Sequence, residues 1–327
     1  LHSYAALDLA MYDIEGILGS VDNDHLGDAL NNFFSAWNEL AQPPVNESLK
    51  LNVVAKAQTL VADFRSIDAA LSQLATDLEK QIQAETENLN RLLQDIGELN
   101  RQVMAAESNG QPANDLRDQR DLRITQLSEL AEVSVLERED GSKDIILAGR
   151  TMVARDSVTL FEGLYRPDGD GYTFAVVTQG SQQDVNLSTG RLQGLLDARD
   201  IHVKAVREQL DAVAGQLIRE VNSLHTQGLS AGGRGVMFFN GDSMHNIGIN
   251  ESIVANENLV VTGSSGSAGD NALALAIADL GRHSVAGSQQ RSVSESYRAV
   301  VTDVAGTLGS FDFMVENQQN VVSALNT

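Results

Sequence analysis

Asp168 and Asp170 lie two residues apart in a glycine-rich turn, a spacing like that of the first ligands in a calcium-binding loop. Calcium prefers oxygen ligands, and such a loop closes with a bidentate glutamate at its twelfth position. The twelfth position here is Gln179, which has no carboxylate. The sequence therefore favours a surface turn over a calcium site.

A second candidate for chemistry is Ser243, in the block Gly241–Met244, which is similar to the nucleophile motif of GDS-type esterases. A nucleophilic serine needs a histidine base within hydrogen-bond reach. Asp279 and His283 lie downstream but are four residues apart, whereas such enzymes use a spacing of three. The block also lies in the middle of the chain instead of after a first strand. A loop is the favoured interpretation, and an esterase is the last of the alternatives.

Metal and cofactor ligands are sparse in the sequence. The histidines include no pair four residues apart and no H-E-x-x-H motif, so none is spaced like a zinc ligand. They are His2, His25, His202, His225, His245 and His283. A Walker loop and a G-x-G-x-x-G after a strand are absent, and the tract 263–269 has glycines without a basic residue, which favours a flexible loop over a phosphate cradle. We therefore expect no catalytic residue, no metal and no cofactor.

Composition excludes several classes of protein. The chain has 327 residues, 42% of them hydrophobic, which suffices for roughly two domains. It has no cysteine, which excludes disulfides, thiolate zinc sites and a cysteine nucleophile. Lys and Arg number 23 against 45 Asp and Glu, so the formal net charge is −22. Nucleic acid is therefore a poor partner, because its binding depends on clustered basic residues.

The hydropathy and the first residues of the chain give no indication of a membrane span or a secretory signal. No apolar run approaches the roughly 18 residues that a membrane span requires. The first residues lack a basic region followed by a small-residue cleavage site, so they do not form a secretory signal. The chain begins at Leu1 and not at Met, so we expect it to be part of a longer protein.

One long helix dominates the expected structure. After a Pro-Pro break, apolar residues recur at steps of three and four, interrupted at Glu85. The positions are Leu60, Phe64, Ile67, Leu71, Leu74, Leu78, Ile82, Leu89, Leu92, Ile96, Leu99 and Val103. This heptad seam, with a stutter near Leu78, predicts one helix over 47–107. Such a helix is about 90 Å long, whereas a compact globule of this size is about 50 Å across, so the pattern predicts a rod.

Further helices are expected to cover that seam. Helical periodicity predicts helices over 26–41, 189–226 and 292–326. It also predicts a returning helix that follows the long one, with Asn114 or Asp115 as its N-cap and its end near Ala131. Together they make a bundle.

Two segments between the helices have a different character. Residues 133–187 alternate at period two and contain Asp-Gly turn signals, which predicts an antiparallel β insert. Residues 228–270 predict loops and short strands. A short helix follows over 272–280, with Asp270 or Asn271 as its cap and Gly281 at its end.

The expected fold class is α+β: an elongated antiparallel helical bundle, or rod, with an inserted antiparallel β domain and a smaller Gly-rich mixed segment. The domain limits that we expect are 1–132 for the N-terminal part of the rod, 133–187 for the β domain, 188–227 for a long helix returning to the rod, 228–290 for the mixed segment, and 291–327 for the C-terminal part of the rod.

Arg120 stands out because it lies in the apolar row of the returning helix, between Leu116 and Ile124. Its guanidinium either reaches past the row to water or forms a partly buried pair with a carboxylate of the long helix. For a hairpin centred near residue 111, Glu98 is the nearest acidic candidate. Additive effects of Arg120→Ala and Glu98→Ala in a double-mutant cycle would exclude that pair.

Several segments, in this order, resemble the flagellar hook-associated protein 1 family. They are LNNFFSAWNELAQPP, the long helix, GQPANDLRDQRD, GRLQGLLDARD, NSLHTQGLSAGGRGVMFFNG, GDNALALAIADL and SESYRAVVTDVAG. The DLRDQRD block and the segment from Asn222 to Phe239 are the most specific. The resemblance implies structural roles, and no catalysis, for Phe33, Trp37, Asn114, Asp115, Asp118, Gln119, Arg120, Asp121, Asn222, His225, Phe238 and Phe239.

The resemblance implies a structural subunit at the junction between the hook and the filament of the bacterial flagellum. Its expected partners are the hook protein, the second junction protein, neighbouring copies in a ring and an export chaperone. The resemblance also implies that the protein is exported to the cell exterior and carries further terminal helices, packed as coiled coils, which we expect to lie outside this chain. The alternatives are a paralogous axial protein (the second junction protein or a flagellin-like protein), and a secreted or phage-type coiled-coil module.

Overall fold

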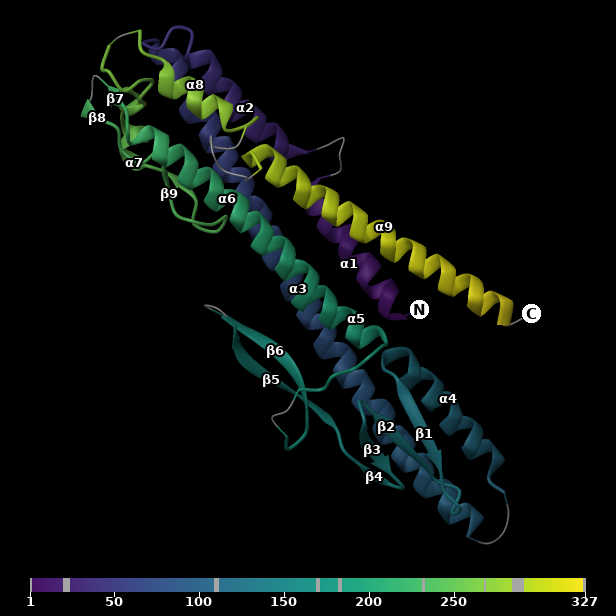
Figure 1. Ribbon diagram of the computed structural model, residues 1–327. Helices are drawn as coiled ribbons and strands as arrows, with labels where there is room; N and C mark the ends of the chain where they lie inside the picture. Colours follow the sequence, from purple (N-terminus) through teal and green to yellow (C-terminus); the bar gives the residue numbers. More distant parts are fainter. Residues whose placement is uncertain are drawn as a thin grey trace. The chain divides into compact units, whose positions relative to one another are not determined.

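The computed structural model describes residues 2–19, 24–108, 112–168, 171–181, 184–230, 233–267, 269–283 and 291–325. The chain divides into two compact units. Unit 1 consists of residues 1–10, 75–202 and 309–327, and unit 2 of residues 11–74 and 203–308. Figure 1 gives the helices and strands of both units, and each unit is described by itself below.

A single helix, α3 (Glu47–Glu107), is common to both units, and its bounds agree with the predicted range. Its 61 residues correspond to about 90 Å. Every seam position from Leu60 to Val103 is buried except Leu74, which is half-buried. The prediction of one uninterrupted helix is therefore confirmed. Its polar interruption, Glu85, is also retained within the helix.

In unit 1, α4 (Asn114–Leu130) follows α3. The predicted N-cap is wrong by one residue: Ala113 occupies the cap position and Asn114 begins the helix. Alanine has no side-chain acceptor, but the Glu107 carboxylate accepts a hydrogen bond from the Ala113 N–H at 3.0 Å and pairs with Arg117 at 2.7 Å. These bonds lower the pKa of Glu107 to about 2. Glu107, a residue of the preceding helix, thus supplies the side-chain acceptor at the start of α4.

The β insert of unit 1 is antiparallel, as predicted, and its strands form two separate sheets. Four strands pair in chain order: β1 (Val133–Glu137), β2 (Lys143–Leu147), β3 (Arg150–Ala154) and β4 (Ser157–Val158). A separate long hairpin pairs β5 (Phe161–Asp168) with β6 (Gly171–Thr178). Gly97 permits the close approach of β4 to α3, because a Cβ at this position would lie 2.5 Å from Val158.

The predicted helix over 189–226 is present but changes its winding. It consists of α5 (Arg191–Asp197), a π-helical turn η1 (Ala198–Val203) and α6 (Lys204–His225). A π turn contains more residues than an α turn and therefore rotates the residues that follow it around the axis. Periodicity based on the α-helix alone does not predict that turn.

Unit 2 contains α2 (His25–Leu40), α8 (Ala272–Asp279) and small elements between α6 and α8. The small elements are β7 (Leu229–Ser230), β8 (Gly233–Arg234), β9 (Phe239–Asn240), β10 (Gly248–Ile249), α7 (Glu251–Ala255) and the 3-10 turn η2 (Glu257–Leu259). Helices α1 (His2–Leu18) and α7 were not predicted. Asn271 holds the cap position of α8, and Gly281 is required by packing, because a Cβ there would lie 2.6 Å from the Phe34 ring.

The last helix, α9 (Val293–Leu325), agrees with the predicted range and begins with a capping box. The Ser292 hydroxyl accepts a hydrogen bond from the Glu295 N–H at 3.2 Å, and the Glu295 carboxylate accepts one from the Ser292 N–H at 2.9 Å. Hydrogen bonds from Ser292 lower the pKa of Glu295.

Replacing Ser292 with alanine is expected to destabilise unit 2 by about 1 kcal/mol, because the buried start of α9 loses its cap. Thermal unfolding should show a midpoint lower by about 2–4 °C. Thr307→Ala is the matched control, since the Thr307 hydroxyl donates to the Asp303 carbonyl within its own helix. Equal midpoints for the two variants would contradict a capping role.

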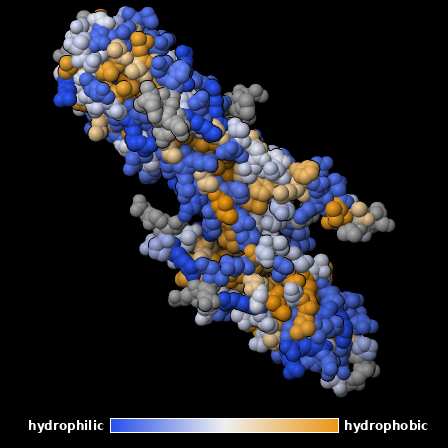
Figure 2. All heavy atoms as spheres, in the orientation of Figure 1, coloured by the Kyte–Doolittle hydropathy of each residue, from blue (hydrophilic) through white to orange (hydrophobic). Residues whose placement is uncertain are grey.

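The face of the molecule in Figure 2 is mostly hydrophilic, with hydrophobic residues gathered in separate patches. None of the helices in the described ranges is both long enough and apolar enough to cross a membrane.

Candidate functional site

Six of the residues singled out in the sequence meet in unit 2. Phe33 and Trp37 come from α2, and His225 comes from the end of α6. Phe238 lies 5.5 Å from Trp37 and 5.4 Å from His225, measured between ring centroids. Phe239 packs against Phe33 at 5.6 Å. All five rings are buried, so the segment after α6 is held against α2 by an aromatic cluster.

Asn222 is the sixth member and fixes the backbone of that segment. Its side-chain oxygen accepts hydrogen bonds from the N–H groups of Phe238 (2.7 Å) and Phe239 (2.9 Å), and its amide donates to the Phe239 carbonyl (2.8 Å). One side chain therefore satisfies three backbone groups of this segment. The two phenylalanines are positioned by these bonds and not only by packing.

His225 is held as a neutral ring with a defined tautomer. Nδ1 lies 2.6 Å from the Val236 carbonyl, which can only accept, and Nε2 lies 3.2 Å from the Val261 N–H, which can only donate. The proton is therefore on Nδ1. Burial lowers the pKa of His225 to about 4. Both ring nitrogens of His225 are therefore occupied by backbone groups, and the ring is 0% exposed.

Arg120 forms the second cluster, in unit 1. Its side chain is 0% exposed, and Nη1 donates to the Asn100 Oδ1 at 2.9 Å and to the Gly141 carbonyl at 2.7 Å. Both interpretations of Arg120 were wrong: the guanidinium does not reach water, and it does not pair with Glu98. Glu98 bonds instead to Arg101 and Gln102 on the exposed side of α3. These bonds lower the pKa of Glu98 to about 2.

The partner that replaces Glu98 is Asn100, which is fully buried and uses all of its hydrogen-bonding capacity. Besides accepting from Arg120, its oxygen accepts from the Lys143 N–H at 3.0 Å. Its amide donates to the Lys143 carbonyl at 2.8 Å and to the Arg155 carbonyl at 2.6 Å. Asn100 thus ties α3 to α4, to β2 and to the turn between β3 and β4.

Asn90 repeats this arrangement ten residues earlier on α3. Its side chain accepts from the Phe161 N–H and donates to the Phe161 carbonyl, both at 2.8 Å, and so fixes the start of β5. The sequence analysis missed both asparagines. A signal was present, because Asn100 lies four residues after Ile96 on the inward side of the seam, where a polar residue needs a partner.

The other members of the block around Arg120 are exposed: Asn114, Asp115, Asp118, Gln119 and Asp121. Asp121 accepts from the Lys143 ammonium at 2.7 Å and so links α4 to β2. The structure therefore gathers this block along α4, with Arg120 alone directed into the core.

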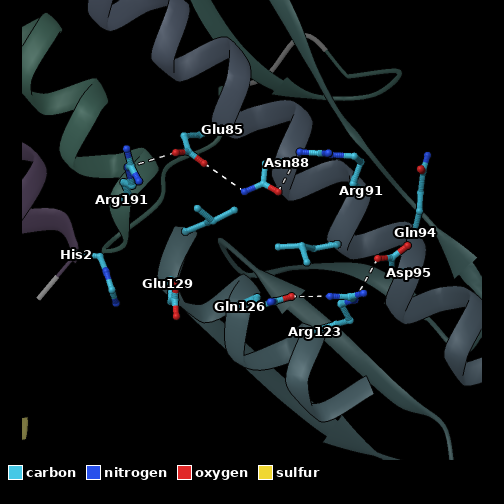
Figure 3. Close-up of a pocket in the computed structure, with 12 residues that line it drawn as sticks. His2, Glu85, Asn88, Arg91, Gln94, Asp95, Arg123, Gln126, Glu129 and Arg191 are labelled. Atoms are coloured by element: carbon cyan, nitrogen blue, oxygen red, sulfur yellow. Dashed lines mark hydrogen bonds and ion pairs between the residues drawn. The ribbon is translucent and has the colours of Figure 1, made fainter. Parts of the chain in front are cut away.

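A polar cavity of about 490 Å³ lies in unit 1, lined by residues of α3, α4 and the start of α5, together with His2 (Figure 3). Two ion pairs connect these helices across it. Glu85 of α3 lies 3.2 Å from Arg191 of α5, and Asp95 of α3 lies 3.2 Å from Arg123 of α4. Most of the charged side chains that line the cavity are therefore in ion pairs.

The candidates for chemistry are not assembled into a reactive site. The Ser243 hydroxyl donates to the Asn246 Oδ1 at 3.1 Å, and in the described part of the chain no hydrogen bond joins Ser243 to a histidine. His245 pairs instead with Asp68 at 3.1 Å. Of Asp168 and Asp170, the two aspartates considered as calcium ligands, Asp170 lies outside the described residues. The described residues contain no group of three or more potential ligands that could hold a metal.

The glycine-rich tract 263–269 is organised by Asp270. The Asp270 carboxylate accepts hydrogen bonds from the Ser265 N–H (2.8 Å) and hydroxyl (2.6 Å). These bonds lower the pKa of Asp270 to about 2.

Comparison with known proteins gives consistent relatives. The family model described as the helical domain of flagellar hook-associated protein FlgK matches residues 11–239. Flagellar hook-associated protein 1 of Salmonella typhimurium is 26% identical over 238 residues, which are 70% of this chain and 43% of that protein. The protein of the same name from Bacillus subtilis is 29% identical over 143 residues, or 44% of this chain and 28% of that protein. The chain thus spans less than half the length of these relatives.

A solved structure has the same fold. The flagellar hook junction protein FlgK from Burkholderia pseudomallei aligns with a TM-score of 0.88 over 99% of this chain and 97% of that chain, at 14% identity. The α+β class with a long helix is therefore confirmed.

The family match covers far more than half of the chain, and it accounts for the ordered motifs from the helix at residue 26 to Phe239. It confirms the resemblance to the hook-associated protein family and supports neither the esterase nor the paralogous axial proteins. The chain belongs to the flagellar hook-associated protein FlgK family.

Proposed function

We propose that this chain is the structural part of a subunit that joins the hook to the filament of the bacterial flagellum, outside the cell. The observation that carries this proposal is the uninterrupted 61-residue helix α3. A continuous helix of about 90 Å is a stiff element of fixed length, which suits a subunit that must maintain spacing under load.

The side contacts of α3 support a mechanical role. Asn90 and Asn100 attach strands to it through backbone groups, and Arg120 closes the contact with α4. In unit 2, the aromatic cluster with Asn222 and His225 holds the segment that follows α6. These residues stabilise the elements that would present surfaces to neighbouring subunits, which is the role that we propose for them.

The proposed partners are the hook protein, the second junction protein and neighbouring copies in a ring, with an export chaperone acting before assembly. The net charge of −22 supports one further feature of this proposal. Like charge repels free subunits from one another and keeps them soluble before assembly, and added salt screens that repulsion.

Deletion of the full-length gene in the source bacterium tests the proposal. Electron microscopy is expected to show hooks without filaments, and expression of the wild-type gene should restore the filaments. Filaments of normal number and length in the deletion strain would overturn the proposal.

A localisation experiment separates the junction from other axial positions. Gln58→Cys introduces a thiol at an exposed position of α3, in a chain of 327 residues that has no other cysteine, and this thiol can carry a fluorescent maleimide. One spot at the base of each filament is expected. Label distributed along the filament would contradict a junction role.

A further inference from the structure

An asparagine followed directly by a glycine, Asn240 and Gly241, lies in unit 2 where β9 ends and the chain turns toward β10. Both residues are exposed. In such a pair the main-chain nitrogen of the glycine can reach the side-chain carbonyl carbon of the asparagine, because glycine has no side chain that would hinder the approach. The pair therefore has the atoms for a ring closure within the main chain.

The two groups that would react are not held by other parts of unit 2. Among the described contacts, the Asn240 side chain has no hydrogen bond and the Gly241 N–H has no acceptor. The neighbouring asparagines differ in this respect: the side-chain amide groups of Asn222, Asn246 and Asn250 each donate to an oxygen of the same segment. Asn240 is therefore free to turn its side chain toward the next peptide group.

The fold requires the glycine of this pair. Gly241 has a φ of +86°, in the left-handed region that favours glycine. A Cβ at this position would also lie 2.4 Å from the Asn246 carbonyl oxygen. Any larger residue would strain the turn, so the nitrogen that follows Asn240 stays unhindered.

The main chain on both sides of the pair is fixed. Before the pair, the Phe239 carbonyl accepts from the Asn222 amide at 2.8 Å, and β9 pairs with β10. After the pair, the Asp242 N–H donates to the Asn246 Oδ1 at 2.8 Å, and a Cβ added at Gly215 of α6 would lie only 2.9 Å from the Asp242 carbonyl oxygen. A change in main-chain length within the pair would therefore disturb contacts on at least one side.

We propose that Asn240 is a site of spontaneous deamidation and that the isoaspartate formed there loosens the segment that follows α6. The Gly241 nitrogen attacks the Asn240 side-chain carbonyl carbon, so a C–N bond forms within a five-membered imide and the bond to the side-chain nitrogen breaks. That nitrogen leaves as ammonia, with the proton that the Gly241 nitrogen loses. Water then opens the imide at either carbonyl and gives aspartate or isoaspartate.

Isoaspartate alters the main chain, whereas aspartate alters only the side chain. In isoaspartate the main chain passes through the former side-chain carbonyl carbon, so it is longer by one carbon, and the former main-chain carbonyl becomes a carboxylate. Both changes lie next to Phe239, whose ring packs against Phe33 at 5.6 Å in the aromatic cluster. We therefore expect the isoaspartate form to weaken the attachment of this segment to α2. The inference is independent of the flagellar function, because the reaction requires only the chain and water.

Peptide mapping of the purified chain tests the reaction. The protein is kept folded at mildly alkaline pH, because the attacking nitrogen must lose its proton, and a zero-time sample corrects for conversion during digestion. Over days, the peptide containing Asn240 is expected to gain the mass difference between an amide and an acid, and electron-transfer fragmentation should identify both isomers. No conversion of Asn240 in the folded chain would overturn the proposal.

Asn186 is the matched control within the same sample. It is exposed and lies outside helices and strands, and its side chain has no hydrogen bond among the described contacts, but Leu187 follows it. Conversion at Asn186 should be undetectable over the interval in which Asn240 converts. Equal conversion at the two asparagines would contradict the role given to Gly241.

Asp140→Asn separates the effect of the dipeptide from the effect of its surroundings. The variant places the same dipeptide in a turn of unit 1, where the Gly141 N–H donates to the Arg138 carbonyl at 3.1 Å and the side-chain oxygen of residue 140 accepts from the Ser142 N–H at 3.1 Å. Residue 140 is expected to convert several-fold more slowly than Asn240, in a variant whose fold is checked by circular dichroism. Equal rates would mean that hydrogen bonds to the reacting groups do not restrain the reaction, and the argument from their freedom in Asn240 and Gly241 would be wrong.

The consequence for unit 2 is tested with Asn240→Asp, which adds the carboxylate without lengthening the main chain. The isoaspartate form, separated from aged wild type by ion-exchange chromatography, is expected to unfold at a lower urea concentration than Asn240→Asp, by Trp37 fluorescence. Its β9 and β10 peptides should also exchange hydrogen faster. Equal urea midpoints would refute the loosening. Asn240→Gln, whose longer side chain would have to close a six-membered ring, should keep the wild-type midpoint and stay unconverted.

Discussion

Replacing Asn100 with alanine is expected to lower the unfolding free energy of unit 1 by about 3–5 kcal/mol. The variant leaves the Lys143 N–H and the carbonyls of Lys143 and Arg155 without their side-chain partner, in a position that is 0% exposed. It also removes one of the two acceptors of the buried Arg120 guanidinium. A buried polar group without a partner lowers the unfolding free energy by more than an average hydrogen bond raises it, and this explains the size of the effect.

Hydrogen exchange measured by mass spectrometry locates this effect. Peptides that cover β2, β3 and α4 should lose protection, whereas peptides of α2 and α8 in unit 2 should keep it. Asn90→Ala is the matched control: it removes two hydrogen bonds to Phe161 at a half-buried position, so a loss of about 1–2 kcal/mol is expected. If Asn100→Ala costs no more than Asn90→Ala, Asn100 does not organise the cluster.

The helices were predictable because their signals are long and redundant. In α3, a dozen apolar positions repeat the same spacing, so one polar residue at Glu85 does not obscure the period. The strands of the insert were also predictable from period-two alternation. The division of these strands into two sheets was not predictable, because it depends on where α3 contacts each strand, as Gly97 and Asn90 do.

Single contacts were less predictable than elements. The sequence indicates that Arg120 lies on the inward face of α4, and the structure agrees. The choice of Glu98 as its partner relied on charge, but the helical phase of α3 places Glu98 on the exposed side and Asn100 on the inward side. A neutral amide can be buried at lower cost than a carboxylate, so the asparagine occupies the core position. The predicted cap at Asn114 or Asp115 was wrong for a similar reason, since the side chain that accepts from the Ala113 N–H, Glu107, belongs to another helix.

The aromatic cluster illustrates what a resemblance adds to periodicity. Phe33 and Trp37 are on the inward face of a predicted helix, but nothing in their spacing relates them to Phe238. The resemblance to a family is what grouped these three residues. In the structure, the ring centroid of Phe238 lies 6.0 Å from that of Phe33 and 5.5 Å from that of Trp37. The hydrogen bonds of Asn222 then explain why a polar residue belongs to an aromatic set.

Acidification is expected to destabilise unit 2 through His225. In the folded chain burial holds the pKa of His225 at about 4, whereas the ordinary value is 6.5. Between these values the unfolded chain binds a proton that the folded chain does not, so falling pH favours unfolding. The stabilisation is complete above pH 6.5 and is lost progressively as pH falls toward 4, by about 3 kcal/mol in total. Protonation of Nε2 would also break its hydrogen bond with the Val261 N–H.

The experiment can use Trp37, the only tryptophan of the chain, which lies 6.1 Å from the His225 ring and reports on unit 2. Urea unfolding followed by its fluorescence should be measured from pH 8 to pH 5, above the isoelectric point near 4.5. Over this range wild type is expected to lose about 2 kcal/mol more than His225→Gln. Other groups cancel in this difference, including Asp63 and Glu220, whose pKa values burial raises and which therefore act in the opposite direction. Thr307→Ala, which removes a hydroxyl bonded to the Asp303 carbonyl of its own helix, is the control and should follow the wild-type profile. Parallel pH profiles for wild type and His225→Gln would mean that the buried ring accepts a proton without unfolding, and the role given to its two backbone bonds would be wrong.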